Sequence, residues 1–328
     1  MKSKKSQALP KILNFLLIII LLVLIAFASY FLYLNIPRSA EQLDVSIQET
    51  QIPEQPLNIE INQFYPNMKF NHNQISYTIN QDCETKKKLK MLEAFDELTR
   101  RATIITFYPT TTNPDIEISC TRESKPTIEG EEKEHFIAGE GGAKEIIQTE
   151  RFNIITDGVI LLYENSEIRT IECDYPNVEL HELMHVFGFD HINNKKSLMY
   201  PFIESCNQIL DQVLVQQIKE LYLQPNLADL YFKDIKAVKR GRYLDFNLTI
   251  KNSGAIDSGI FTLTVLDNDK IIEEKDLDPI KFGAGITLTT KNLRLTHLNP
   301  DQITFIIDQK NKIEEIDENN NIANIKLN

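Results

Sequence analysis

One eleven-residue segment near the middle of the chain constrains the fold more than any other feature. Residues 181–191 read His-Glu-Leu-Met-His-Val-Phe-Gly-Phe-Asp-His, the pattern H-E-x-x-H-x-x-G-x-x-H. On an α-helix, His181 and His185 lie one turn apart on the same face, so both imidazoles can bind one metal ion. Gly188 can adopt the positive φ that ends a helix and turns the chain sharply. We therefore predict a helix, a turn at Gly188, and His191 returning as a third ligand of the same metal.

The chemistry expected of this segment is that of a catalytic zinc site. Three imidazole ligands leave the fourth tetrahedral position of zinc open to water, which is typical of catalytic sites. Glu182 lies beside the ligand face of the predicted helix, where it can take a proton from that water as general base. A metal-free helix is the weaker interpretation, because three of the six histidines of the chain fall in this window. We predict one zinc ion held by His181, His185 and His191, with Glu182 as the catalytic residue.

A second short motif follows the third histidine. Ser197-Leu-Met-Tyr-Pro201 resembles the Met-turn of the metzincin zinc proteases, and it is most similar to that of the matrixin branch. In that clan a methionine forms an apolar floor beneath the three zinc-bound imidazoles. The resemblance therefore implies this role for Met199 and a place in the substrate pocket for Tyr200. It also implies a protein or peptide substrate.

The residues around these motifs fit such a catalytic domain, which we place at residues 71–225. Alternating apolar residues predict strands at 75–79, at 104–108, at 116–120 and within 135–163. The last group includes an edge strand that would pair with an extended substrate. Amphipathic patterns predict a helix at 84–101, whose lysines form a solvated face, and a closing helix near 210–221. With the zinc helix, the expected fold class is α+β: a mixed sheet and three helices.

Two departures from the matrixin pattern are visible. Matrixins usually carry an additional structural zinc held by further histidines, whereas here only His72, His135 and His297 remain, scattered along the chain. The closing helix has Val213 and Leu214 where matrixins tend to carry an acidic pair, so anchoring of the N-terminus in the matrixin manner is not expected. We therefore predict a minimal matrixin-like enzyme with a single zinc.

The N-terminal segment predicts a membrane anchor. Residues 12–34 are uncharged and almost wholly apolar, and as a helix they would span roughly 35 Å. The tail of residues 1–11 is basic, so the positive-inside rule places it in the cytoplasm and the rest of the chain outside. The alternative is secretion after cleavage of a signal peptide near Ala28, because Ala26-Phe-Ala28 resembles a cleavage site. We favour a single-pass anchor in the cell membrane because the apolar run continues through Leu34.

Charge and cysteine content agree with an exported protein. The first forty residues hold five of the 35 basic side chains and none of the 47 acidic ones, which leaves 30 against 47, or −17. Such a surface argues against nucleic-acid binding. Outside the cell the four cysteines should pair, and three pairings are open. We favour Cys83–Cys120, between the first helix and a core strand, and Cys173–Cys206, around the zinc motif. Thiol ligation of metal is weaker because there is no CxxC pair.

The remaining residues divide into a linker and a second domain. Residues 35–70 are polar and proline-bearing, and are expected to form a stalk or to include a short inhibitory pro-segment. Residues 226–328 hold about seven short alternating segments between turns, which predicts an all-β immunoglobulin-like sandwich. The ending from Ile307 to Asn320 resembles the CARDB module of prokaryotic surface proteins, which implies a cell-surface partner, with a plain spacer as the alternative. The acidic tail from Asp308 to Glu318 could hold calcium, although a solvated loop is favoured.

Together these features predict a membrane-anchored, outward-facing zinc endopeptidase with a trailing sandwich. The second hypothesis is a surface adhesion protein whose metzincin-like domain is a catalytically silent scaffold. The intact Glu182 argues against the scaffold, because a structural metal site does not need that carboxylate. Chelator-sensitive cleavage of a generic protein such as casein would distinguish the two.

Overall fold

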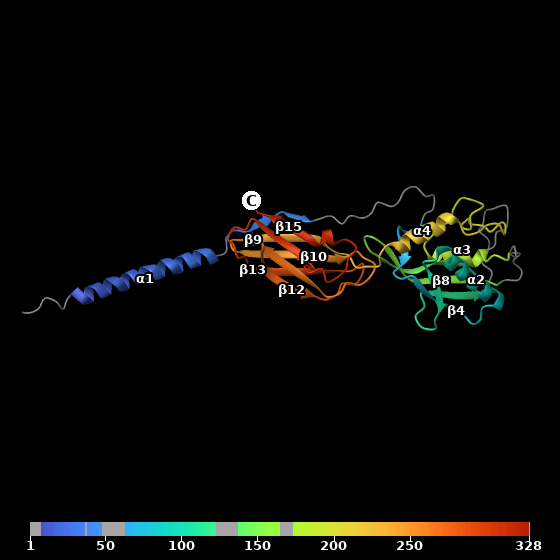
Figure 1. The fold of residues 1–328 in the computed structure, drawn as a ribbon, viewed down its shortest axis with the longest axis horizontal. Coiled ribbons are helices and arrows are strands. Elements are labelled where there is room, and N and C mark those ends of the chain that lie inside the picture. The colour runs from blue at the N-terminus through green and yellow to red at the C-terminus, as the bar shows by residue number, and fades with distance from the viewer. Residues whose placement is uncertain (1–7, 37, 48–62, 123–136, 165–172, 328) are drawn as a thin grey trace, which may run out of the picture.

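The computed structural model describes residues 8–36, 38–47, 63–122, 137–164 and 173–327. An N-terminal helix, a β-sandwich and an α/β domain follow one another in space (Figure 1). The helix α1 (Ala8–Asn35) is apolar over Leu13–Asn35, which is long enough to cross a membrane, and none of this window is buried by the rest of the protein. The predicted apolar helix is therefore confirmed. A helix with these properties serves either as an anchor or as a signal sequence.

The α/β domain is built on a six-stranded mixed sheet. Its longest strand, β8 (Asn153–Tyr163), pairs with β7 (Gly139–Gln148) along one side and with β3 and then β6 along the other. The remaining bounds are β3 (Met68–Phe70), β4 (Gln74–Ile79), β5 (Thr106–Pro109) and β6 (Ile116–Thr121). All neighbouring strands are parallel except β7, which is antiparallel to β8. Within the described ranges no strand pairs with the outer side of β7, so it is an edge strand.

Three helices complete this domain, as the sequence predicts. They are α2 (Thr85–Ala102), α3 (Asn177–Val186) and α4 (Gln212–Leu223). The apolar face of α2 buries Met91, Phe95 and Leu98 in the core. Leu92, although apolar, is 38% exposed. It follows Met91 directly and so lies about 100° further around the helix.

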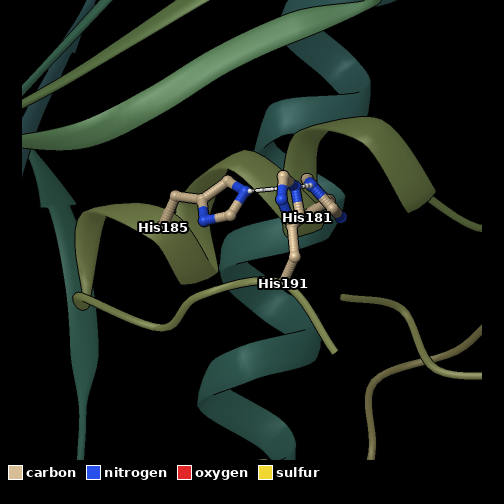
Figure 2. A group of neighbouring side chains, drawn as sticks. All are labelled: His181, His185 and His191. Atoms are coloured by element: carbon tan, nitrogen blue, oxygen red, sulfur yellow. Dashed lines mark hydrogen bonds between the residues drawn. The ribbon is translucent and has the colours of Figure 1, made fainter. Parts of the chain in front are cut away.

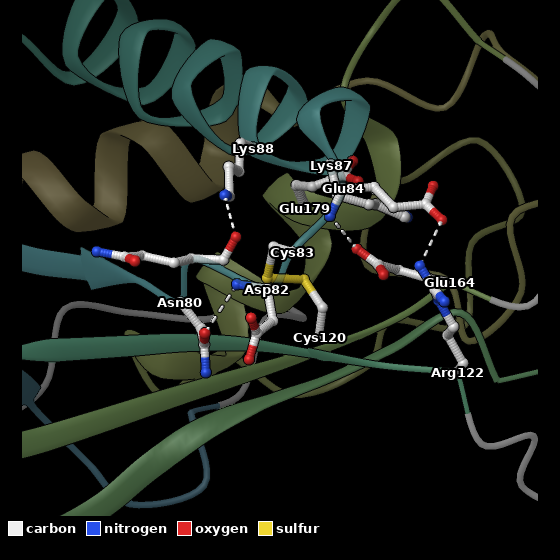
Figure 3. The surroundings of a disulfide bond; sticks show 11 residues. Asn80, Asp82, Cys83, Glu84, Lys87, Lys88, Cys120, Arg122, Glu164 and Glu179 are labelled. Atoms are coloured by element: carbon white, nitrogen blue, oxygen red, sulfur yellow. Dashed lines mark hydrogen bonds and ion pairs between the residues drawn. A yellow bond between two sulfur atoms is a disulfide. The ribbon is translucent and has the colours of Figure 1, made fainter.

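A disulfide and an ion pair join α2 to its neighbours (Figure 3). Cys83, just before α2, is bonded to Cys120 of β6, as predicted. Lys87 Nζ lies 3.1 Å from Glu179 Oε1 in the first turn of α3. The lysine face of α2 is therefore not wholly solvated, because Glu179 is buried and its charge is balanced by Lys87.

The second domain is a β-sandwich, as predicted, but two of its strands come from an unexpected part of the chain. Its C-terminal elements are β9 (Leu230–Arg240), β10 (Tyr243–Asn252), β11 (Phe261–Asp267), β12 (Lys270–Leu277), β13 (Gly285–Arg294), β14 (Gln302–Ile307), the 3₁₀ turn η2 (Glu318–Asn321) and β15 (Ile322–Lys326). β1 (Glu41–Leu43) pairs with β9, and β2 (Val45–Ile47) pairs with β15. The two sheets therefore have the orders β1-β9-β10-β13 and β12-β11-β14-β15-β2.

Residues 41–47 thus correct the interpretation of residues 35–70 as a stalk. Leu43, Val45 and Ile47 alternate along this short segment and pack into the sandwich core. Their apolar face gains burial only when the two strands join sheets formed by residues 194 to 280 positions later in the chain. The α/β domain therefore lies, in sequence, between two parts of one sandwich.

A buried junction connects the sandwich to the α/β domain. Arg151 lies in the turn between β7 and β8, and its Nε is 2.5 Å from Asp229 Oδ2 at the start of the sandwich. The two side chains are only 5% and 0% exposed. Beside them Phe152 and Ile154 pack against Ala255. A charge pair desolvated to this degree is costly to break, because either partner alone would be a buried charge.

The acidic tail of the sandwich is only partly the solvated loop that we favoured, because residues 309–312 and Glu314 are exposed but Asp308 and Glu315 are buried. Asp308 is 1% exposed, and its Oδ2 accepts a hydrogen bond from the backbone N–H of Ile313 at 2.7 Å. Glu315 is 6% exposed and accepts a hydrogen bond from Asn321 at 3.0 Å, and burial raises the pKa of Glu315 to about 8. No three carboxylates of this tail, all of which lies in the described ranges, gather as a metal-binding group. Its buried acids therefore act as acceptors for the fold.

Candidate metal centre

Three histidine rings converge beside α3 (Figure 2). His181 and His185 project from successive turns of α3, and His191 returns from the loop after the helix. The distances between their Nε2 atoms are 3.0, 3.2 and 3.3 Å. Ligand nitrogens on a tetrahedral zinc ion, with Zn–N near 2.05 Å, are about 3.3 Å apart. The three predicted ligands are therefore brought together in a set that fits zinc.

The opposite ring nitrogens hold two of these imidazoles in the orientation that metal binding needs. His181 Nδ1 lies 2.7 Å from the carbonyl oxygen of Leu198, and His185 Nδ1 lies 2.7 Å from that of Phe189. A carbonyl oxygen can only accept, so each Nδ1 carries the proton and each Nε2 presents its lone pair. Lone pairs that face one another at about 3 Å repel unless a cation lies between them. The orientation of the rings therefore favours a bound metal.

Burial keeps the imidazoles in the form that binds metal. It lowers the pKa of His181 to about 3, with the neighbouring His185 as the next cause. Burial also lowers the pKa of His185 and of His191. Since neutral imidazole is the ligand form, the three rings are ready to bind a cation at neutral pH.

The predicted turn after α3 is present at Gly188. Its φ is +83°, in the left-handed region that glycine adopts without strain. A Cβ at this position would lie 2.4 Å from the sulfur of Met68 on β3. The turn that brings His191 back therefore needs glycine twice, once for its backbone angle and once for its close packing.

Glu182 lies directly beneath β7 and is 6% exposed. A Cβ at Gly139 would lie 2.7 Å from Glu182 Cγ, and a Cβ at Gly141 would lie 2.2 Å from the carbonyl oxygen of Glu182. Burial raises the pKa of Glu182 to about 8, while the backbone N–H of Gly141 donates a hydrogen bond to the carboxyl and opposes this shift. The absence of side chains at Gly139 and Gly141 therefore allows β7 to lie close to the helix.

The loop that carries the predicted Met-turn is held by Ser197, the first residue of that motif, and by Asp211 and Gln208, which no motif indicated. Ser197 Oγ donates to Asp211 Oδ2 at 2.6 Å, and the backbone N–H of Met199 donates to Ser197 Oγ at 3.0 Å. Gln208, which is fully buried, donates to the carbonyl oxygen of Phe202 at 2.9 Å. A buried glutamine eleven residues after Ser197 is a recognisable signal only when the fold is known.

Of the two residues that the Met-turn resemblance implicates, Met199 is completely buried. It follows Leu198, whose carbonyl oxygen orients His181. Tyr200 is half-buried and its ring contacts Phe202, with 5.9 Å between ring centroids. The floor beneath the metal and the substrate pocket stay predictions for these two side chains.

The second predicted disulfide encloses this whole site. Cys173 is bonded to Cys206, with a sequence separation of 33. The loop so closed contains α3, all three histidines and Met199. Both favoured pairings are therefore confirmed, and the Cys173–Cys206 bond closes the loop that contains the candidate metal ligands.

One neighbour of the site comes from outside the predicted catalytic domain. The backbone N–H of Phe64 donates to the carbonyl oxygen of Gly188 at 2.8 Å, and the Phe64 ring lies 5.8 Å from the ring of His185. The sequence interpretation left this residue in the stalk, because no spacing rule connects it to the zinc motif 117 positions later.

Comparisons with known proteins divide the chain at the same place as the fold. The matrixin family model matches residues 69–223, and the CARDB model matches residues 227–325. High choriolytic enzyme 1, a hatching-enzyme zinc protease from the medaka fish Oryzias latipes, is 16% identical with a TM-score of 0.28, covering 47% of this chain and 90% of that one. A CARDB domain from Pyrococcus furiosus, solved in complex with di-metal ions, is 19% identical with a TM-score of 0.26, covering 31% of this chain and 87% of that one. No curated protein matches the chain.

The family matches agree with the geometry of both domains. The matrixin match contains α3, the histidine set and both disulfides, and the CARDB match contains the seven C-terminal strands. The chain therefore carries a matrixin domain, of a zinc metalloprotease family, at residues 69–223 and a CARDB domain at residues 227–325.

Proposed function

We propose that this protein is a membrane-anchored, extracytoplasmic zinc endopeptidase. The observation that carries the proposal is the convergence of His181, His185 and His191 beside a buried Glu182. A silent scaffold, even one that holds a metal, would not need this carboxylate. The matrixin match supports the same reaction class.

The residues divide the chemistry between them. Zinc held by the three histidines would supply Lewis acidity, which polarises the scissile carbonyl and acidifies water. Glu182 would accept the proton of the attacking water and then donate it to the leaving amine. Its buried surroundings suit both tasks, because a carboxyl with a raised pKa both takes up and returns a proton near neutral pH.

The edge strand β7 supports an extended peptide as substrate. Its outer side has no partner strand in the described ranges, so its backbone N–H and C=O groups can pair with a peptide main chain. Gly139 and Gly141 lie on this strand directly above Glu182. A peptide paired with β7 would therefore pass over the carboxylate and the histidines. Met199 as the floor and Tyr200 as a pocket residue belong to the same proposal.

The location follows from the first helix and the disulfides. An apolar helix that nothing in the protein buries, preceded by a basic tail, supports a single-pass anchor with the N-terminus in the cytoplasm. Two disulfides in the matrixin domain support an oxidising compartment. The CARDB domain supports a cell-surface setting.

The deciding experiment compares two carboxylates of α3 in the purified full chain. In Glu182→Gln, hydrolysis of casein should fall by roughly a hundredfold or more, because the amide cannot take a proton. Zinc content, measured by elemental analysis, should stay at one per chain. Glu179→Gln is the matched control, since Glu179 is also buried but is paired with Lys87, and this variant should keep its activity.

Three outcomes would decide against parts of the proposal. Full activity in Glu182→Gln would remove that residue from the role of base. A wild-type protein that binds zinc but cleaves nothing would favour the silent adhesion scaffold. Two zinc ions per chain, or none, would contradict the predicted single site.

A further inference from the structure

The segment just before β3 is fixed against the turn of the metal centre. Gln63 Nε2 donates to the carbonyl oxygen of Met68 at 2.9 Å and to that of Phe187 at 3.0 Å, and Gln63 Oε1 accepts from the backbone N–H of Met68 at 3.0 Å. The backbone N–H of Phe64 donates to the carbonyl oxygen of Gly188 at 2.8 Å. These four hydrogen bonds involve the Gln63 side chain and the Phe64 backbone. They do not involve the Phe64 ring, which can therefore contact a bound ligand.

The ring of Phe64 combines contact with the metal centre and exposure. Its centroid lies 5.8 Å from that of His185, with an angle of 31° between the planes. The residue nevertheless remains 51% exposed. A large aromatic ring that is half exposed beside a predicted zinc ligand, on a backbone hydrogen-bonded to the Gly188 turn, presents an apolar surface to whatever occupies the site.

The direction of the neighbouring elements shows which part of a substrate would reach this ring. Along β7 the chain passes from Gly139, which touches Glu182, to Gln148, which pairs with Asn153. Asn153 also pairs with Met68, which packs on Gly188 at the end of α3 where Phe64 lies. The Phe64 end of the site therefore corresponds to the C-terminal end of β7.

A peptide that pairs antiparallel with β7 would have its N-terminal residues at that end. Antiparallel pairing is slightly more stable per residue than parallel pairing. When the scissile bond lies at Glu182, the substrate residues on its N-terminal side would lie near Phe64. The ring is at the right end to contact one of their side chains.

We propose that Phe64 forms the wall of a substrate subsite that accepts a bulky apolar or aromatic side chain on the N-terminal side of the scissile bond. The assignment rests on the proposed endopeptidase function. It makes a residue outside the matrixin match a determinant of specificity.

The test uses the full chain in lipid nanodiscs and a bond that the wild type cuts in casein. Quenched-fluorescent peptides around this bond carry either Phe or Ala at each of the three positions before it. For the wild type, kcat/KM should be higher with Phe at one of these positions. In Phe64→Ala this preference should fall by about tenfold, because the pocket loses its apolar wall. Phe64→Tyr should retain it.

Two further variants control the comparison. Tyr108→Ala removes an exposed aromatic ring on β5, which is the edge strand at the other end of the sheet from β7. This variant should leave the preference unchanged. Phe64→Leu keeps an apolar but smaller side chain and should give an intermediate preference. It also provides the measurement if Phe64→Ala unfolds or loses zinc. An unchanged Phe-to-Ala ratio in the Phe64 variants at all three positions before the bond would overturn the proposal.

A binding measurement separates this proposal from the proposed function. Dye-labelled alanine peptides that carry a single Phe at one of their last three positions, and the all-Ala peptide, are titrated into chelator-treated protein, and anisotropy gives Kd. One of the Phe peptides should bind several-fold more tightly than the all-Ala peptide to the wild type, and Phe64→Ala should abolish the difference. If the wild type cleaves nothing, the proposed function fails. A binding preference that is present in the wild type and lost in Phe64→Ala would still support the subsite. An equal preference in wild type and Phe64→Ala contradicts it.

Discussion

Removing the Cys173–Cys206 disulfide should loosen the metal centre more than its energetic cost alone suggests. The bond closes a loop with a sequence separation of 33, and chain-entropy arithmetic for a loop of this size gives about 4 kcal/mol of stabilisation. The loop contains the three predicted ligands. Without the disulfide, the conformational freedom of this loop increases, and the three histidines must still be held together to bind zinc. We expect the double variant Cys173→Ser/Cys206→Ser to lose about 4 kcal/mol in urea unfolding and to release zinc faster to a competing chelator.

The other disulfide provides a matched control. Cys83–Cys120 has a sequence separation of 37, so its removal should cost the α/β domain nearly the same free energy, about 4 kcal/mol. Its loop contains none of the histidines. Zinc release at a temperature where both variants remain folded should therefore be faster only in the Cys173/Cys206 variant. Equal release rates, or release that is unchanged from the wild type, would refute the idea that this disulfide acts on the site.

Three further perturbations test the packing around the site and the junction. Arg151→Ala should destabilise the protein by roughly 3–5 kcal/mol in urea unfolding, because it leaves the buried Asp229 without its cation; a loss below 1 kcal/mol would show that the pair is dispensable. Gly188→Ala should lower zinc affinity in chelator competition, because a Cβ meets Met68 and the positive φ alone costs about 1–2 kcal/mol; wild-type affinity would contradict this. Lys69 is fully buried, and burial lowers its pKa from 10.5 to about 8, so the folded state favours the neutral amine. The contribution of Lys69 to the free energy of unfolding should therefore be largest above pH 10.5 and should fall by about 3 kcal/mol as pH decreases to 8. Lys69→Met should lose this part of the pH dependence in urea titrations at pH 8 and pH 10, and an unchanged slope would assign it to another group.

The parts of the site that lie close together in sequence were predictable. Helical geometry places His181 and His185 on one face, and Gly188 is the residue type that the turn to His191 requires. The Cys173–Cys206 pair could be favoured because its members flank this segment. Each of these inferences uses spacing within one local structure, where the geometry of the chain leaves few alternatives.

The parts that depend on distant pairing were not predictable. β1 and β2 are only three residues each, too short for alternation to distinguish them from a linker, and their partners lie 194 to 280 positions later in the chain. Phe64 reaches His185 through hydrogen bonds to the Gly188 turn, which no spacing rule records. The roles of Gly139 and Gly141 appear only when β7 is placed over Glu182.

If α1 anchors the protein in a membrane, as we propose, the division of the sandwich between two distant parts of the chain affects how the protein could be shed. Residues 48–62 connect β2 to the α/β domain, and a single nick there would break the covalent path between α1 and the matrixin domain. β1 would still be hydrogen-bonded to β9, and β2 to β15, so the clipped ectodomain would remain attached to its anchor. Escape would also require both short strands to leave their sheets. Retention at the surface would therefore depend on the folding stability of the CARDB domain and not only on the susceptibility of the connecting segment to proteases.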